Sequence, residues 1–497
     1  MVVQPQYAPL DTIAGDRFGM PEARHLLLRA GFGGTPAQVR AMAEMGPEAA
    51  VDLLLDTEGT PFRDDTDGGF SGEVIVPLTP AQRSAYRRAQ QTGDEDTLAR
   101  FRGERQRQQR ADREQIRGMQ RWWLERIIET PKPLEEKMTL FWHGHFATSY
   151  RTIENSYHML MQNRLFRRHA LGNVGDLLFS IIRDPAMLAY LDNNDSRRDA
   201  PNENLARELM ELFSLGAGNY SERDIKEGAR ALTGYTFEGN EFVLDRRNHD
   251  SGTKAILGQR GAIDGDGFVR AILAQRACAG FIARKLYGFF ATDLPQGGAE
   301  ASRETEHVIS GLTDDLIGAR YEIKPMLRRL LLSRHFYTYD VMNARIRSPI
   351  ELIAQTIRSL GAPARSLSVL ADASASMGQN LFFPPNVAGW PGGRTWISSS
   401  TLFVRQNLCV YLLTGRLPSD EGPSDSIDVE IVLDGLAPSR RDVPEAVAEH
   451  LLRHATGFAI DEDVAILSEI LKDASSIREG VTKALVLVTS MPKYQLC

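Results

Sequence analysis

The spacing of hydrophobic residues predicts helices along most of the chain. In "MQRWWLERIIET" (119–130) apolar residues recur every three to four positions, and the prolines of the following "PKP" end the pattern. "LEEKMTLFWHG" (134–144) restarts it, and "PNENLARELMELFSLGAG" (201–218) repeats it, with Gly216 as the expected C-cap. We therefore predict a mainly α fold, a large multi-helix domain with minor β-hairpin elements.

The β elements are expected in two places. "YTFEGNEFVLD" (235–245) alternates around Gly239-Asn240, a pair typical of two-residue hairpin turns. It follows a helix for which Ser221 and Asp224 have capping-box spacing. Residues 417–440 are interpreted as a polar linker with one short strand, before three amphipathic helices that finish the chain.

Composition divides the chain into four parts. Residues 82–118 contain ten arginines and six acidic residues with little apolar periodicity, which indicates a solvated helical excursion. A docking arm for an acidic partner is the alternative. The predicted parts are 1–57, N-terminal helices of the main domain; 58–118, a charged, Arg-rich insertion; 119–416, the main helical domain with the candidate site; and 417–497, a linker and C-terminal helices that pack on it.

Overall composition excludes several classes of protein. The 497 residues are 42% hydrophobic and 25% charged, which is typical of a globular protein with a large core. A net charge of −7 argues against a general nucleic-acid binder, and no apolar run is long enough to span a membrane. The three cysteines are far apart, so neither a disulfide framework nor a zinc ribbon is expected. The first residues lack the pattern of a signal peptide, so we expect a cytoplasmic location.

The segment "FWHGHFATS" (141–149) is the first candidate for chemistry. Residues two apart on a continuous helix point about 200° away from each other, so His143 and His145 could not bind one metal ion there. We expect Gly144 to end the helix in a left-handed conformation and to place His145 on the loop beyond, as a metal ligand. A buried histidine bonded to the backbone is the alternative.

Two carboxylates form the second candidate. Glu208 and Glu211 lie one helical turn apart and could serve a metal ion or act as an acid–base pair. The alternative is a salt-bridged surface stripe in which Arg207 pairs with Glu211.

The loop "NHDSGTK" (248–254) is the third candidate. His249, Asp250 and Lys254 offer imidazole, carboxylate and ammonium groups within six residues. The alternative is a turn in which Asp250 bonds its own backbone and His249 is exposed.

The Pro- and Gly-rich loop "FFPPNVAGWPGGRTWISSS" (382–400) is the fourth candidate. The rings of Trp390 and Trp396 could stack on a sugar or line a cofactor pocket. The alternative is that both rings plug the core beneath the loop.

These candidates predict two sets of residues. Because imidazole and carboxylate ligands without paired cysteines suit zinc, manganese or iron, we expect a divalent metal as the cofactor. No nucleophile elbow, His-Glu-x-x-His helix or dinucleotide fingerprint is present. The predicted metal ligands are His145, Glu208, Glu211 and His249, and the predicted catalytic residues are His249, Asp250, Glu208 and Glu211.

Several segments together resemble one family. In order and spacing they are similar to the bacterial family known as domain of unknown function 1800, over about residues 20–495. The closing "SMPKYQ" resembles that family's usual Ser-Pro-Glu-Phe-Gln. The segments are "HLLLRAGFGGTPAQV", "FWHGHFATS", "NLARELMELFSLGAGNYSERDIKEGARALTGYTF", "NHDSGTKAILG", "FIARKLYGFF", "RIRSPIELI" and "GQNLFFPPNVAGWPGGRTWIS".

The resemblance implies little about activity, which is not established for that family. Members are commonly exported and encoded beside a family that resembles sulfatases and alkaline phosphatases, so a sulfatase-like partner is expected. The family pattern aromatic–Trp–x–x–His–Phe matches His145 rather than His143. This chain departs from the pattern at Phe213-Ser214, where many members have His-Thr.

Two functions from different classes remain open. One is an enzyme, metal-dependent, with a His/Glu/Asp cleft. The other is a non-catalytic binding or scaffold protein that presents the aromatic loop and the Arg-rich arm to a partner protein or a polysaccharide. Convergence of the four predicted metal ligands and Asp250 in space would favour the enzyme.

Overall fold

A computed structural model describes residues 9–57, 68–295, 301–416 and 427–497. Within these ranges the chain forms 23 α-helices and two small antiparallel sheets of two strands each. The fold is therefore mainly α with minor β-hairpins, as the hydrophobic pattern predicts.

The first half of the chain is helical up to the hairpins. Its helices are α1 (Met20–Arg29), α2 (Pro36–Met45), α3 (Pro47–Leu55), α4 (Pro80–Thr92), α5 (Glu95–Glu129), α6 (Pro133–His145), α7 (Tyr150–Ile153), α8 (Ser156–Arg168), α9 (Val174–Ile181), α10 (Pro185–Tyr190), α11 (Asn204–Glu211) and α12 (Glu222–Ala231). The strands are β1 (Tyr235–Glu238), β2 (Glu241–Leu244), β3 (Lys254–Ile256) and β4 (Gln259–Gly261).

The second half returns to helices. They are α13 (Gly265–Leu273), α14 (Arg276–Phe290), α15 (Arg303–Gly318), α16 (Ile323–Leu332), α17 (Pro349–Leu360), α18 (Leu367–Ser376), α19 (Ser399–Thr414), α20 (Val429–Val432), α21 (Pro444–Thr456), α22 (Asp461–Lys472) and α23 (Ile477–Ser490). Short 3-10 helices include η4 (Gly393–Trp396) and η6 (Pro492–Gln495). Residues 427–440 contain α20 and a 3-10 turn and no strand. The rest of the predicted linker, residues 417–426, lies outside the described residues, so the expected strand stays a prediction there. None of the helices in the described ranges is long and apolar enough to cross a membrane.

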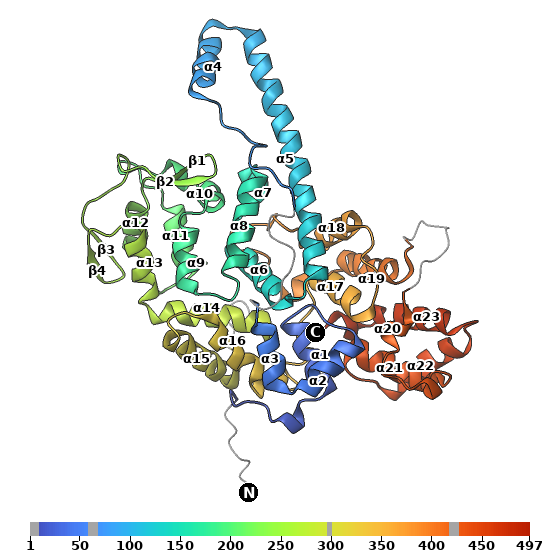
Figure 1. Ribbon diagram of the computed structural model, residues 1–497. Coiled ribbons are helices and arrows are strands. Elements are labelled where there is room, and N and C mark those ends of the chain that lie inside the picture. Colours follow the sequence, from blue (N-terminus) through green and yellow to red (C-terminus); the bar gives the residue numbers. More distant parts are fainter. Residues whose placement is uncertain (1–8, 58–67, 296–300, 417–426) are drawn as a thin grey trace.

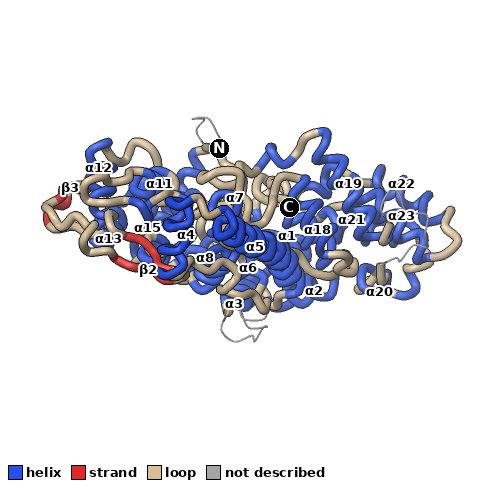
Figure 2. The backbone as a smooth tube through the Cα atoms, turned by 90° about the horizontal axis from the view of Figure 1, so that it is seen from above, coloured by secondary structure: helices blue, strands red, loops and turns tan. Residues whose placement is uncertain are grey.

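The body is elongated, with the hairpins at one end and the C-terminal helices at the other (Figures 1 and 2). Two hydrophobic cores run through it. One core joins α1–α3 to α9–α16, and the other joins the base of α5 to α17–α23. Helix α6 contributes Trp142 to the first core and Leu140 to the second, so α6 lies where the two cores meet.

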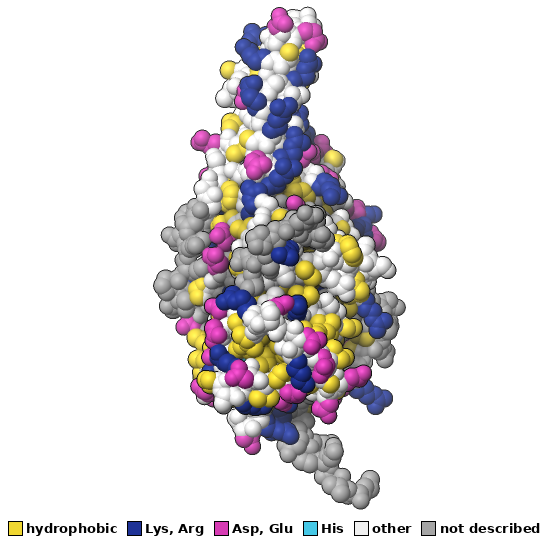
Figure 3. Space-filling view, turned by 90° about the vertical axis from the view of Figure 1, so that its right-hand side faces the viewer, with side chains coloured by type: hydrophobic (Ala, Val, Ile, Leu, Met, Phe, Trp, Pro, Cys, Tyr) yellow, Lys and Arg dark blue, Asp and Glu magenta, His cyan; other side chains and the backbone are white. Residues whose placement is uncertain are grey.

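Helices α4 and α5 form an arm that projects from the body (Figure 1). Between residues 80 and 107 the only buried side chain is Ala89, and arginines are spread along the visible face of the arm among acidic and other side chains (Figure 3). Burial begins at Asp112, which accepts hydrogen bonds from the Tyr150 hydroxyl (2.7 Å) and the Ser156 backbone N–H (2.9 Å). The charged pattern therefore corresponds to a solvated arm, and α5 enters the core at Asp112.

Turn chemistry places the hairpins. Strands β1 and β2 pair from Tyr235↔Leu244 to Glu238↔Glu241, around Gly239 in the left-handed region (φ 61°), as the Gly-Asn pair predicts. The second hairpin, β3–β4, was not expected from the sequence. Its turn contains Leu257 with φ of 49°, an uncommon conformation for a non-glycine residue that no local pattern signals. Ser221 and Asp224 form the predicted capping box at the start of α12.

Candidate functional site

The end of α6 differs from the expectation at Gly144. The helix continues through Gly144 to His145, and Gly144 is not among the residues with a positive φ. Glycine is needed instead on the facing loop. Gly389 has a φ of +80°, and a Cβ there would lie 2.0 Å from the Gly144 carbonyl oxygen. The loop around Trp390 therefore packs directly on the last turn of α6.

Because the helix is continuous, His143 and His145 enter different surroundings, as their spacing predicts. His143 Nε2 accepts a hydrogen bond from the Phe382 backbone N–H (3.1 Å), and its ring lies among Trp123, Phe382 and Trp390. Burial lowers the pKa of His143 to about 3. Since its ring nitrogen already serves a backbone group, His143 is a packed core histidine.

His145 has one satisfied ring nitrogen and one unsatisfied one. Its Nε2 lies 2.9 Å from the Phe213 carbonyl oxygen, so Nε2 must carry the proton and Nδ1 keeps the lone pair. Nδ1 is buried and has no hydrogen-bond partner among the described residues. Burial, and next the charge of Lys285, lower the pKa of His145 to about 3, so the ring stays neutral. Phe213, the position of the departure from the family pattern, places its ring 6.1 Å from that of His145.

His145 lines a cavity of about 400 Å³ together with both tryptophans of the aromatic loop. Helix α6, helix α14 and the loop at 388–396, which we call the aromatic loop, form most of its wall. The residues of its wall with aromatic or charged side chains are Phe141, His145, Phe281, Arg284, Lys285, Phe289, Asp293, Arg345, Trp390 and Trp396. The alternative in which both rings only plug the core does not describe Trp390, which is half-buried at the cavity.

The two tryptophans play different parts in this wall. Trp396 ends η4 and is only 4% exposed, so it combines a core position with contact to the cavity. The indole Nε1 of Trp390 is buried, and no residue in the described ranges bonds it. A buried Trp usually donates this N–H to a hydrogen-bond acceptor. The Trp390 donor and the His145 acceptor are therefore alike in lacking the hydrogen bond that a buried polar atom normally makes.

The cavity carries an excess of positive charge. Arg284 pairs with Glu306, and Arg345 lies 3.5 Å from Asp293 and 3.7 Å from Glu351. Lys285 differs, because it is exposed at the cavity and no charged group acts on it within the described ranges; partial desolvation lowers its pKa. Its ammonium lies 5.4 Å from the centre of the Phe281 ring. An ammonium without a counter-ion beside aromatic rings is suited to an anionic group.

Glu208 and Glu211 do not line this cavity. Glu211 accepts a hydrogen bond from the Tyr220 hydroxyl (2.7 Å). Arg207 bonds Glu203 and Glu222 rather than Glu211, so the predicted partner in the stripe was wrong. Burial, and next the charge of Glu211, raise the pKa of Glu208.

His249 and Asp250 lie elsewhere, in a loop whose polar atoms are largely paired. His249 Nδ1 lies 2.8 Å from the Thr233 carbonyl oxygen. Asp250 accepts hydrogen bonds from Arg230 Nε (2.7 Å) and from the Gly252 backbone N–H (2.8 Å), and the bond to Arg230 lowers its pKa. The loop therefore has the self-bonded turn of the alternative, although His249 is half-buried rather than exposed.

The predicted metal ligands are not assembled. In the described part of the chain no group of three or more His, Cys, Asp or Glu residues is placed to hold a metal ion. The physical reason is that the side chains are engaged separately. His145 bonds the Phe213 carbonyl, Glu211 bonds Tyr220, and His249 bonds the Thr233 carbonyl. Of the seven candidate side chains, the structure brings together His145, Trp390 and Trp396.

Sequence reasoning missed Lys285, Arg345 and the Phe281 ring. A signal was present in "FIARKLYGFF" (281–290), where an Arg-Lys pair interrupts a run of aromatic and aliphatic residues. Pattern alone could not assign it, because the same pair on a solvated helix face looks identical in one sequence.

Comparison with known proteins agrees with the motif order. No curated protein and no solved structure gives a match. A family model described as "Protein of unknown function (DUF1800)" matches residues 25–496. Because this match covers nearly the whole chain, the chain belongs to the DUF1800 family of proteins of unknown function, as the resemblance of its motifs predicts.

Proposed function

We propose that this protein binds an acidic saccharide in the cavity between α6, α14 and the aromatic loop. The observation that carries the proposal is that two residues of its wall, His145 and Trp390, each have a buried ring nitrogen, Nδ1 and Nε1, without a hydrogen-bond partner in the described part of the chain. Buried polar groups are almost always hydrogen-bonded, so an unpaired acceptor and an unpaired donor beside one cavity suit the hydroxyl groups of a ligand.

The rest of the wall supports the same chemistry. Aromatic rings such as Trp390 and Phe281 offer flat apolar faces on which a sugar ring can stack. A volume of about 400 Å³ falls in the range usual for small-molecule sites. Within the described residues Lys285 has no counter-ion, so it favours a ligand with a carboxylate over a neutral one.

His145 favours binding over catalysis at this cavity. A general base works best with a pKa near the working pH, and the pKa of His145 is lowered to about 3. The imidazole is therefore neutral at pH 7 and only weakly basic. It serves as a fixed hydrogen-bond acceptor, held by the bond between its Nε2 and the Phe213 carbonyl.

A second candidate is acid–base chemistry at Glu208 and Glu211. Glu208 has a raised pKa, and Glu211 is hydrogen-bonded to Tyr220. A carboxyl group with a raised pKa one helical turn from a second carboxyl group is an arrangement from which an acid–base pair can be built. This pair is the part of the predicted enzyme site that retains support.

Titration with defined oligosaccharides tests the first proposal. Tryptophan fluorescence and calorimetry are followed as oligogalacturonate or neutral maltohexaose is added. We expect binding of oligogalacturonate only, weakened at least about tenfold in Lys285→Ala, since one charge-assisted hydrogen bond is lost. Lys226→Ala, which removes an exposed lysine on α12, is the matched control and should bind like the parent. Equal binding of both saccharides, or binding of neither, would overturn the proposal.

The same mixtures separate the two candidates. A binding protein leaves the length of the oligogalacturonate unchanged over long incubation. Shortening of the chains that is abolished in Glu208→Gln, but retained in Lys285→Ala at high saccharide concentration, would favour the acid–base pair.

A further inference from the structure

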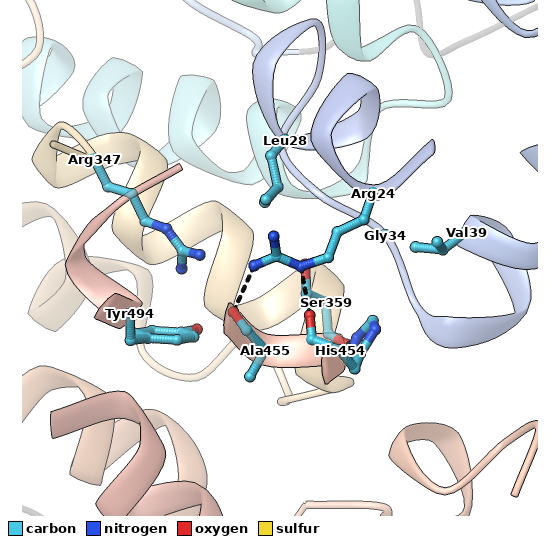
Figure 4. A pocket seen from close by; sticks show the side chains of 9 residues that line it. All are labelled: Arg24, Leu28, Gly34, Val39, Arg347, Ser359, His454, Ala455 and Tyr494. Atoms are coloured by element: carbon cyan, nitrogen blue, oxygen red, sulfur yellow. Dashed lines mark hydrogen bonds between the residues drawn. The ribbon is translucent and has the colours of Figure 1, made fainter. Parts of the chain in front are cut away.

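A second, much smaller cavity lies between α1, α21 and the segment that precedes α17. Its volume is about 10 Å³, room for one particle about the size of a water molecule. Arg24 and Arg347 point toward one another across it, and the Tyr494 ring lies beside Arg347 (Figure 4). Both arginines are buried, with exposed fractions of 7% and 2%.

Neither guanidinium has an acidic partner within the described ranges. Arg24 donates from Nε to the His454 carbonyl and from Nη2 to the Ala455 carbonyl, both at 2.6 Å. Arg347 donates from Nε to the Leu496 carbonyl (3.0 Å) and lies 4.2 Å from the centre of the Tyr494 ring. The carbonyl oxygens accept hydrogen bonds from the two guanidinium groups, and the Tyr494 ring lies against that of Arg347. Neither a carbonyl nor a ring carries a full negative charge that would balance a guanidinium.

The two charges oppose one another electrostatically. Burial, and next the charge of Arg347, lower the pKa of Arg24 to about 9. A third buried arginine, Arg405, bonds the Arg347 carbonyl oxygen and keeps its Nη1 without a partner, and burial lowers its pKa to about 10. Tyr494 and Cys497 favour the charged form of Arg24, and Glu351 favours that of Arg405, but no acidic group forms an ion pair with Arg24 or Arg347 within the described ranges. Buried charges are normally paired directly, so these two cations lack an adjacent counter-charge.

We propose that this cavity holds one monovalent anion of halide size, chloride in the cell, between Arg24 and Arg347. The volume excludes phosphate and sulfate, whose four oxygens need several times the space of one water molecule. A water molecule would fit but would leave the repulsion between the guanidinium groups in place. A single negative charge between them offsets that repulsion and can accept their remaining N–H donors.

The anion would connect three parts of the fold. Arg24 belongs to α1, its two carbonyl acceptors end α21, and Arg347 lies just before α17. Gly457, which follows α21, has a φ of +96°, and a Cβ there would lie 2.9 Å from Arg24 Nη1. The site therefore fastens the C-terminal helices to the N-terminal helix, and its occupancy should stabilise the whole protein.

Thermal melting of the full chain under matched salts tests the proposal. The protein is purified in sodium gluconate, and sodium chloride or sodium bromide then replaces gluconate at constant ionic strength. We expect the melting temperature to rise and to saturate, by roughly 1–3 °C at a halide concentration about 100 times Kd. Arg347→Gln should abolish this response, whereas Arg102→Gln, which changes an exposed arginine of the arm, should keep it.

Crystals soaked in bromide decide the matter even if Arg347→Gln does not fold. An anomalous peak between the two guanidinium groups of the parent protein would support the proposal. A cavity without that peak would overturn it, as would a melting temperature that depends on ionic strength but not on the identity of the anion.

Discussion

The two ends of α6 carry buried polar side chains that differ in how fully they are paired. In the first turn, Glu136 accepts hydrogen bonds from Trp123 Nε1 (3.0 Å), from Arg126 and from Arg167 Nε (2.7 Å). In the last turn, His145 leaves Nδ1 unpaired, and the neighbouring Trp390 leaves Nε1 unpaired. Glu136 and His145 are both buried, so burial alone does not mark a binding site. The difference is whether the protein supplies every partner itself.

The first turn of α6, where Glu136 is fully hydrogen-bonded, is expected to have a structural role. Glu136→Gln tests this role and should lower the free energy of unfolding more than any other substitution proposed below. The substitution keeps the shape of the side chain but removes a negative charge that both Arg126 and Arg167 contact. Breaking a buried ion pair by removing one partner costs about 3–5 kcal/mol. Urea denaturation of the variant should show a loss of this size.

The adjacent Glu135 provides the control. Its carboxylate lies 3.9 Å from Arg126, and burial raises its pKa, so the folded protein gains little from its charge. Glu135→Gln should therefore change the free energy of unfolding by less than about 1 kcal/mol. Equal losses at the two positions would mean that pairing does not distinguish them.

One substitution made at both ends sharpens the comparison. Trp123→Phe removes the N–H that bonds Glu136 and should cost about 2–3 kcal/mol, because a hydrogen bond to a charged group is lost. Trp390→Phe removes an N–H that has no partner, so its stability should change by less than about 1 kcal/mol.

The effect on oligogalacturonate binding should be the reverse. Trp390→Phe should weaken it at least about fivefold through the lost donor, and Trp123→Phe should leave it unchanged. A large loss of stability in Trp390→Phe with unchanged binding would make the aromatic loop a core plug.

Acid should affect the two ends at different pH values. The pKa of His145 is lowered to about 3 by burial, so below about pH 6.5 the unfolded chain takes up a proton that the folded chain does not. Stability from this residue is complete above pH 6.5 and falls by about 2 kcal/mol on reaching pH 5.

At the other end, burial alone would raise the pKa of Glu136, but Arg167 and Arg126 hold it below its ordinary value. The stability from Glu136 is therefore present above about pH 4.5 and is lost below it.

Urea denaturation at pH 7.5, 6 and 5 measures the loss of stability that is expected from His145 before that from Glu136. His145→Gln should reduce the dependence on pH between 6.5 and 5 by about one proton, and His307→Gln, which changes an exposed histidine of α15, should not. The same dependence in the parent and in His145→Gln would show that His145 is not held neutral.

The sequence predicts the elements of this fold better than it predicts the site. Helical spacing, the Ser221–Asp224 capping box and the Gly239 turn are local signals, and each corresponds to an observed element. The cavity depends on contacts between positions that are far apart in sequence. His145 meets Phe213, and Gly389 meets Gly144, through packing that no pattern within one segment encodes.

Local patterns also overstated the other candidates. The spacing of Glu208 and Glu211 was correct for one helical face, but their partners, such as Tyr220, come from the following segment. His249 and Asp250 looked reactive because three polar groups lie close in sequence. In the fold, the Thr233 carbonyl is hydrogen-bonded to His249, and Arg230 donates a hydrogen bond to Asp250. A candidate residue can be identified from sequence, whereas its unpaired atoms can be identified only in the structure.

The outer part of the arm, residues 80–107, provides the smallest expected effect, because its only buried side chain is that of Ala89. Replacing residues 80–107 by a short Gly-Ser linker removes one buried side chain, Ala89, and keeps Asp112 with its bonds to Tyr150 and Ser156. We expect the free energy of unfolding to change by less than about 0.5 kcal/mol, since tolerance to deletion follows the burial of what is removed. A longer deletion, to residue 118, should cost more because it removes Asp112 and Ile116 from the core. If the short deletion were as costly as the long one, the arm would stabilise the body through its charges. If neither deletion changed the free energy of unfolding, the boundary between surface and core in α5 would lie beyond Asp112.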